Sequence, residues 1–189
     1  RSISDWSSDV CSSDPLCRDT AQNTLAQRRN DFTIVYSRFR RNRTIGSAVM
    51  LAHDAVLRHV DQATGRVEMA QCGHPNPAVL SPSGAVTFHG KGGLPIGLIS
   101  DAVYETVVFT LSPGDRLMLY SDGVTECRDT AGRELEEAGF ARLLSRNTGL
   151  GIETLAEAIA WDLDRHAGGK APQDDISCVI LDYRGPNAR

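Results

Sequence analysis

Residues 114–126 read GDRLMLYSDGVTE, and this stretch decides the fold prediction. The apolar run Leu117–Tyr120 predicts a buried strand that passes directly into Ser-Asp-Gly. Asp122 is therefore expected where a sheet gives way to a loop, and Gly123 leaves room for a close backbone approach or a positive φ. A carboxylate in that position is well placed to hold a hard cation, although an ordinary Asp-Gly turn is the better explanation when the pair is taken alone.

Short apolar runs separated by turn residues predict a group of strands that includes this stretch. The predicted strands are Val67–Cys72, Ala78–Leu80, Val86–His89, Thr106–Leu111 and Arg116–Ser121. The segments between them carry the Gly, Pro and Asp residues that turns require. Because only a few turn residues separate the last two strands, we expect these two to form a hairpin.

Helical patterns flank this group of strands. Residues 20–60 are predicted to be mostly helical, with one strand at 32–36. The helical pattern is clearest beyond Gly46, where apolar residues recur at three- and four-residue steps: Val49, Ala52, Val56 and Val60. Two more helices are predicted at Glu134–Asn147 and Ile152–His166, before a final strand at Ile176–Leu181. Strands in the middle with helices around them favour an α+β fold over alternating βαβ units.

Length and composition indicate one globular domain that does not bind nucleic acid over its whole surface. The chain has 189 residues, 41% hydrophobic residues and a net charge of −4. No apolar run approaches the roughly 18–20 residues of a membrane span. The five cysteines include no C-x-x-C pair, which argues against a disulfide framework or a thiolate zinc site. Residues 1–15, RSISDWSSDVCSSDP, have no structural period, and we interpret them as a disordered non-native leader outside the fold.

Two other segments contain residue types that carry chemistry. Asp174 and Asp175 precede the final strand, and adjacent carboxylates repel each other unless solvent or a metal ion relieves the repulsion. Solvent is the simpler explanation for that pair alone. His74 lies in QCGHPNP, residues 71–77, and is either an acid or ligand or a structural histidine at a proline turn.

An arginine-rich block offers a different function. Between Arg28 and Arg43 there are six arginines and one aspartate, which is compatible with a nucleic-acid contact. No aromatic stacking platform accompanies the block, so a solvated surface is the favoured interpretation.

Four blocks in a fixed order give the most specific signal. CGHPNPAVL, GGLPIGL, PGDRLMLYSDGVTE and DDISCVIL together resemble the SpoIIE/RsbU-type serine/threonine phosphatases, the bacterial branch of the metal-dependent PP2C-like (PPM) family. The resemblance covers 61–183, about two-thirds of the chain, and it implies a domain at 16–183 followed by a polar tail at 184–189.

The resemblance implies a fold and a chemistry. The fold would be an α/β/β/α sandwich of two mostly antiparallel sheets flanked by helices. Asp122 and Asp174 would be catalytic residues that bind two Mn²⁺ or Mg²⁺ ions, and Asp175 is a weaker candidate ligand. A metal-activated water would hydrolyse phosphoserine or phosphothreonine on a regulatory protein of the anti-sigma-factor-antagonist type, in the cytoplasm. No nucleic acid or membrane is implied, and an upstream sensor or receiver domain would lie outside this chain.

One block of the family pattern is missing. The family opens with G-D-x-x-G-H-G, whose aspartate helps to hold both metals, and this sequence has no such block. We therefore expect the domain to be N-terminally incomplete. The alternative function is a catalytically impaired phosphatase fold that binds a regulatory partner without turnover.

Overall fold

The computed structural model describes residues 24–29, 32–37, 49–51, 55–61, 63–95, 98–99 and 103–186. The elements in the first half of the described chain are β1 (Thr24–Arg29), β2 (Phe32–Ser37), β3 (Val49–Leu51), β4 (Ala55–Val60), β5 (Arg66–Gln71), β6 (Ala78–Leu80) and β7 (Val86–Phe88). The second half contains β8 (Thr106–Thr110), β9 (Arg116–Tyr120), α2 (Asp122–Thr125), α3 (Glu136–Arg146), α4 (Ile152–His166) and β10 (Ile176–Asp182).

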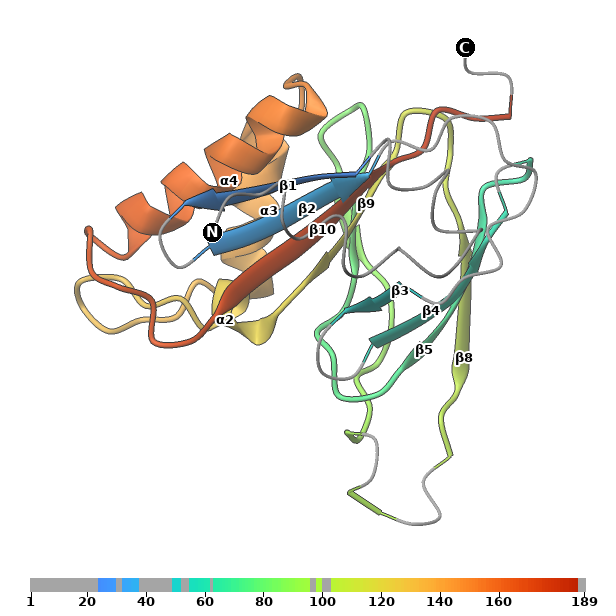
Figure 1. The fold of residues 1–189 in the computed structure, drawn as a ribbon, viewed down its shortest axis with the longest axis horizontal. Helices are drawn as coiled ribbons and strands as arrows, with labels where there is room; N and C mark the ends of the chain where they lie inside the picture. The colour runs from blue at the N-terminus through green and yellow to red at the C-terminus, as the bar shows by residue number, and fades with distance from the viewer. Residues whose placement is uncertain are drawn as a thin grey trace, which may run out of the picture.

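The strands form two sheets, which are separate in Figure 1. One sheet has six strands in the order β1-β2-β10-β9-β6-β7, and the other has four in the order β3-β4-β5-β8. All pairs are antiparallel except β2 with β10. This confirms the predicted α+β class with two mostly antiparallel sheets.

Strand β9 lies in the middle of the six-stranded sheet and is buried on both faces. Leu117 and Leu119 belong to an apolar cluster shared with Val67 and Met69 of the four-stranded sheet. The alternate residues Met118 and Tyr120 face the opposite way, into a second cluster. Its other members include Phe140 and Leu144 of α3, Leu155 and Ile159 of α4, and Ile180 of β10. Burial on both faces explains why β9 is a continuous apolar run.

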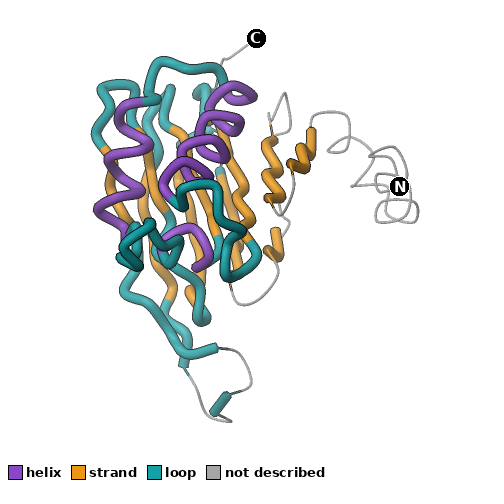
Figure 2. The backbone as a smooth tube through the Cα atoms, turned by 90° about the vertical axis from the view of Figure 1, so that its left-hand side faces the viewer, coloured by secondary structure: helices purple, strands orange, loops and turns teal. Residues whose placement is uncertain are grey.

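The two long helices cover one face of the six-stranded sheet (Figure 2). Leu155, Ile159 and Leu163 recur every four residues along α4, and all three are fully buried. Two glycines with positive φ, Gly168 and Gly169, follow the end of α4, as their sequence predicts. Among the described residues, no helix covers the outer face of the four-stranded sheet.

The helical prediction for residues 20–60 is wrong, because the described parts of this segment are strands β1 to β4. Val49 pairs with Leu57 across the antiparallel β3–β4 pair, so the apolar steps after Gly46 belong to two strands that run in opposite directions. Valine fits a pleated sheet at least as well as a helix, and its spacing alone does not distinguish the two. The strand predicted at 32–36 is confirmed as β2.

The predicted hairpin of β8 and β9 is also wrong. β8 pairs with β5, whereas β9 pairs with β10 and β6 in the other sheet. The connection crosses between the sheets: the Leu111 amide donates to the Gly65 carbonyl (2.9 Å), and the Gly114 amide donates to the Tyr183 carbonyl (2.7 Å). The burial patterns account for the separation, because β8 alternates with one exposed face while β9 is buried on both.

The predictions for residues 1–15 and for the side chains of the arginine block at 28–43 lie outside what the structure describes. Within the described ranges, no helix is both long enough and apolar enough to cross a bilayer.

Candidate active site

The two segments that carry the predicted aspartates are joined through Ser121. β9 and β10 are antiparallel, with Tyr120 opposite Cys178, so the end of one strand meets the beginning of the other. The Ser121 amide donates to the Ser177 carbonyl (2.9 Å), and the Ser177 amide donates to the Ser121 Oγ (2.9 Å). The Ser121 hydroxyl in turn donates to the Asp175 carbonyl (2.9 Å). These three bonds hold the S-D-G and D-D-I-S segments side by side.

Gly123 is required for this close approach. A Cβ at this position would lie 2.7 Å from the Asp175 carbonyl oxygen and 3.2 Å from its carbonyl carbon. Gly123 is not among the glycines with positive φ, so of the two roles predicted for it, close backbone approach is the one that the structure shows.

The three predicted carboxylates lie at this edge and are exposed. Asp122 is the first residue of α2, and its Oδ1 accepts from the Gly123 amide (3.0 Å). The Asp174 Oδ1 accepts from the Asp175 amide (2.7 Å). Each of these bonds is local, and the carboxylates remain open to solvent.

The donor chemistry at this edge suits a hard divalent cation in part. Carboxylate and carbonyl oxygens are the ligands that Mn²⁺ and Mg²⁺ prefer. However, no three His, Cys, Asp or Glu side chains in the described part of the chain cluster closely enough to hold an ion. Asp122, Asp174 and Asp175 therefore stay predicted ligands, and the described residues supply fewer of them than a two-ion centre takes.

A buried tyrosine precedes Asp122 by two residues in the chain. Tyr120 is fully buried, and its ring centroid lies 4.7 Å from that of Phe140. Its hydroxyl donates to the Asn76 carbonyl (2.8 Å). Burial raises the pKa of Tyr120 above its ordinary value, with smaller contributions from Glu137 and Cys178, so the hydroxyl remains a hydrogen-bond donor.

Two amide side chains that the sequence analysis did not single out are hydrogen-bonded next to Tyr120. Gln71 is buried at the end of β5, and its Nε2 donates to the Asn76 Oδ1 (2.9 Å). Asn76 Nδ2 then donates to Glu137 Oε1 (2.9 Å) at the start of α3. The available signal was an amide at an inward-facing position at the end of β5, and another inside the Gly-His-Pro-Asn-Pro loop.

His74 has a structural environment. Its side chain is buried, and its Nδ1 lies 2.8 Å from the Pro75 carbonyl oxygen. The imidazole also meets the Tyr120 ring edge-on, with a centroid distance of 6.4 Å. Of the two readings of His74, this geometry favours the histidine that supports a proline turn.

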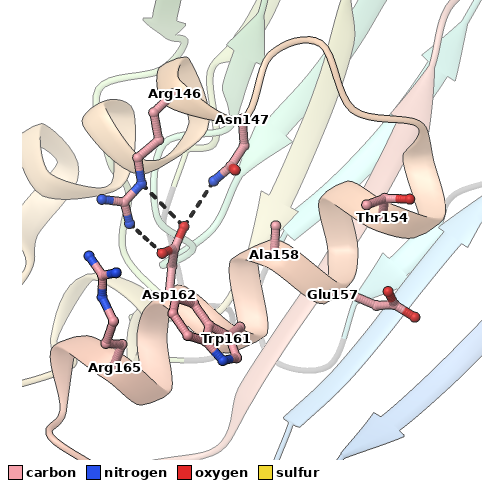
Figure 3. A pocket seen from close by; sticks show the side chains of 8 residues that line it. All are labelled: Arg146, Asn147, Thr154, Glu157, Ala158, Trp161, Asp162 and Arg165. Carbon is pink, nitrogen blue, oxygen red and sulfur yellow. Dashed lines mark hydrogen bonds and ion pairs between the residues drawn. The ribbon is translucent and has the colours of Figure 1, made fainter.

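A hollow lies elsewhere, between α3 and α4 (Figure 3). Its volume is about 540 Å³ and no predicted site residue lines it; the lining is Arg146, Asn147, Thr154, Glu157, Ala158, Trp161, Asp162 and Arg165. The buried Asp162 carboxylate is held by the Arg146 guanidinium (2.5 Å) and the Asn147 amide (2.9 Å). The Arg165 guanidinium lies 5.2 Å from the Trp161 ring centroid. The charged groups of Arg146, Asp162 and Arg165 thus already have partners within the chain.

The family model described as "Stage II sporulation protein E (SpoIIE)" matches residues 18–184. Protein IcfG of Synechocystis sp. (strain ATCC 27184 / PCC 6803 / Kazusa) is 24% identical over 125 residues, which are 66% of this chain and 19% of that protein. The chain thus spans about a fifth of this curated relative.

Two solved structures share the fold. The SiaA-PP2C domain of Pseudomonas aeruginosa matches with a TM-score of 0.60 and 22% identity, over 68% of this chain and 50% of that one. The RsbU and RsbW domains of Rv1364c from Mycobacterium tuberculosis match with a TM-score of 0.54 and 21% identity, over 71% of this chain and 37% of that one.

Proposed function

Because this chain belongs to the SpoIIE family of PP2C-type serine phosphatase domains, we propose that it is a metal-dependent protein phosphatase of bacterial regulatory signalling. Its reaction would be the hydrolysis of phosphoserine or phosphothreonine. The observation that supports this most directly is the joining of the S-D-G and D-D-I-S segments through Ser121, because it gathers carboxylates from two distant segments at one exposed edge.

Each residue at the edge has a proposed role. Asp122 and Asp174 are the catalytic residues that hold Mn²⁺ or Mg²⁺, and Asp175 is a weaker candidate ligand. Ser121 fixes the distance between the two segments. When bound, a pair of such ions lowers the pKa of a coordinated water and neutralises phosphoryl charge. The chain itself needs no side-chain nucleophile for this reaction.

The proposed substrate is a phosphorylated regulatory protein of the anti-sigma-factor-antagonist type. The family match supports this class, and so does the likeness to a structure that contains RsbU and RsbW domains. A substrate of that class places the reaction in the cytoplasm, without nucleic acid or membrane. An upstream sensor or receiver domain is proposed as the source of regulation, and the larger size of the relatives is compatible with one.

A second candidate is a phosphatase fold that binds the regulatory partner without turnover. It is favoured by one observation: within the described residues, no three metal-ligating side chains come together. The two candidates share the fold and the partner, and they differ only in catalysis.

Hydrolysis of an aryl phosphate and of a phosphorylated antagonist protein, with Mn²⁺ or with EDTA, separates the two candidates. For the phosphatase, activity requires Mn²⁺, and Asp122→Asn lowers it by more than the ~10–100-fold that follows loss of an outer-shell partner of a metal. Asp164→Asn is the matched control, since it makes the same change at an exposed aspartate of α4. Partner binding with no turnover at millimolar Mn²⁺ would instead establish the binding module.

A further inference from the structure

Side-chain hydrogen bonds connect Gln71, Asn76 and Glu137, and the Tyr120 hydroxyl joins them through the Asn76 main-chain carbonyl; we call these four residues the amide network. They come from β5, the loop that follows it, β9 and the first turn of α3. The network therefore links both sheets to a helix at the end of the sandwich where Asp122 lies.

Gln71 uses its whole hydrogen-bonding capacity within the network and its neighbouring loops. Its Nε2 donates to the His74 carbonyl (2.8 Å) and to the Asn76 Oδ1 (2.9 Å). Its Oε1 accepts from the amides of Lys91 (3.0 Å) and Gly92 (2.9 Å). A primary amide has two donors and two acceptor lone pairs, so this buried side chain is fully satisfied.

Two glycines in the loop that follows β7 approach Gln71 closely. A Cβ at Gly90 would lie 2.2 Å from the Gln71 Oε1, and a Cβ at Gly93 would lie 2.3 Å from the Gln71 carbonyl oxygen. Gly90 therefore lets the loop approach the Gln71 side chain closely, and Gly93 lets the same loop approach the Gln71 main chain. A buried polar network whose members are all paired rigidifies its surroundings.

Asn76 is the junction that reaches the candidate site. Its Oδ1 accepts from Gln71, its Nδ2 donates to Glu137, and its carbonyl accepts from the Tyr120 hydroxyl. Tyr120 precedes Asp122 by two residues and is the last residue of β9. The backbone that leads into Asp122 is therefore tied to Asn76 on one side and, through Ser121, to Asp175 on the other.

We propose that Asn76 and Tyr120 are positioning residues, which fix the start of α2 so that Asp122 is held in place for its ligand. This rests on the proposed function only in naming Asp122 as a metal ligand; the positioning itself is a property of the metal-free chain. Gln71 holds Asn76 in the orientation that the junction requires.

Hydrogen exchange of the metal-free protein tests the positioning directly. Tyr120→Phe removes only the hydroxyl, and Tyr104→Phe is the control, because it removes a hydroxyl that donates to the Pro95 carbonyl on the surface. The reporter is the Glu126 amide, which donates to the Asp122 carbonyl (2.8 Å), and the reference is the Leu155 amide at the start of α4. We expect Tyr120→Phe to speed exchange at Glu126 by roughly threefold to tenfold, the size of one buried hydrogen bond, with Leu155 unchanged.

Two outcomes of this exchange experiment would overturn the proposal. One is equal acceleration at Glu126 and Leu155, which is the result of a general loss of stability. The other is no change at Glu126, or the same change in Tyr104→Phe.

Calorimetric Mn²⁺ titration of Asn76→Ala adds a second measurement, made at a temperature where circular dichroism shows the variant to be folded. We expect Mn²⁺ to bind at least about threefold more weakly than to the wild type, as loss of an outer-shell partner costs ~10–100-fold at metal sites. Unchanged Mn²⁺ affinity in the folded variant contradicts the positioning role. If the wild type binds no Mn²⁺, the proposed metal centre fails, and the exchange experiment alone decides the positioning.

Discussion

Replacement of Gly123 by alanine should destabilise the fold through one clash. The new Cβ would lie 2.7 Å from the Asp175 carbonyl oxygen. That oxygen already accepts the Ser121 hydroxyl at 2.9 Å and belongs to the segment that enters β10, so the backbone cannot move away freely. Insertion of an extra carbon into a well-packed site typically costs about 1–3 kcal/mol.

Gly149→Ala is the matched control for this prediction. A Cβ at Gly149 meets nothing within 4 Å, and Gly149 is not among the residues with positive φ. Both substitutions restrict the unfolded chain equally, by about 0.4–1 kcal/mol in favour of folding, so this contribution cancels in the difference between the two variants.

Thermal and urea unfolding followed by circular dichroism measure this difference. For a chain of this size, 1 kcal/mol shifts Tm by roughly 2–4 °C, so Gly123→Ala should melt about 2–12 °C below Gly149→Ala. Equal Tm values for the two variants would refute the claim that S-D-G and D-D-I-S are packed backbone against backbone.

Two further predictions concern the helix-side core. Leu155→Ala should lower the free energy of unfolding by about 2–5 kcal/mol, because Leu155 is fully buried. Val103→Ala is the control, since that side chain is 90% exposed and its loss should change the free energy of unfolding by no more than about 0.5 kcal/mol. Urea titration of both variants measures the difference. Burial raises the pKa of the Cys178 thiol from 9.0 to about 12, so the unfolded chain releases this proton first and unfolding free energy should fall as pH rises above about 9. Cys178→Ala should flatten that fall in urea titrations between pH 8 and 11, and an unchanged slope in the variant would contradict the assignment.

The sequence pattern predicted secondary structure best where the buried residues of an element recur regularly within that element. Leu155, Ile159 and Leu163 repeat on one face of α4, and the helix lies at the predicted residues. The apolar run of β9 and the turn residues around β6 and β7 were equally informative. In these segments, side-chain burial and local backbone preference point to the same structure.

The prediction of strand pairing failed where the position of a strand in a sheet depends on residues far away in the sequence. Nothing within residues 106–121 says that β8 pairs with β5 and β9 with β10, since a short turn allows a hairpin as readily as a crossing between sheets. The valines of β3 and β4 were equally compatible with a helix face, because their spacing contains no information about where the chain reverses.

The sequence led to a prediction of charged residues for the candidate site, but it did not lead to a prediction of the neutral residues beside them. Asp122 and Asp174 were predicted because their S-D-G and D-D-I motifs resemble those of the phosphatase family, and they stay predicted ligands. Gln71 and Asn76 lie five residues apart, but their connections reach Tyr120 and Glu137, far along the chain. Contacts of that range appear only once the fold is known.

The three Ser121 bonds have a consequence for the order in which the molecule matures. Their partners, Asp175 and Ser177, follow Ser121 by 54 and 56 residues. During synthesis, a chain that has already made Asp122 still lacks the strand against which β9 must pair. The candidate site therefore forms only when β10 has been synthesised and has paired with β9. A partly synthesised chain contains Asp122 but lacks the sheet edge at which Asp122 and the Asp174–Asp175 segment meet.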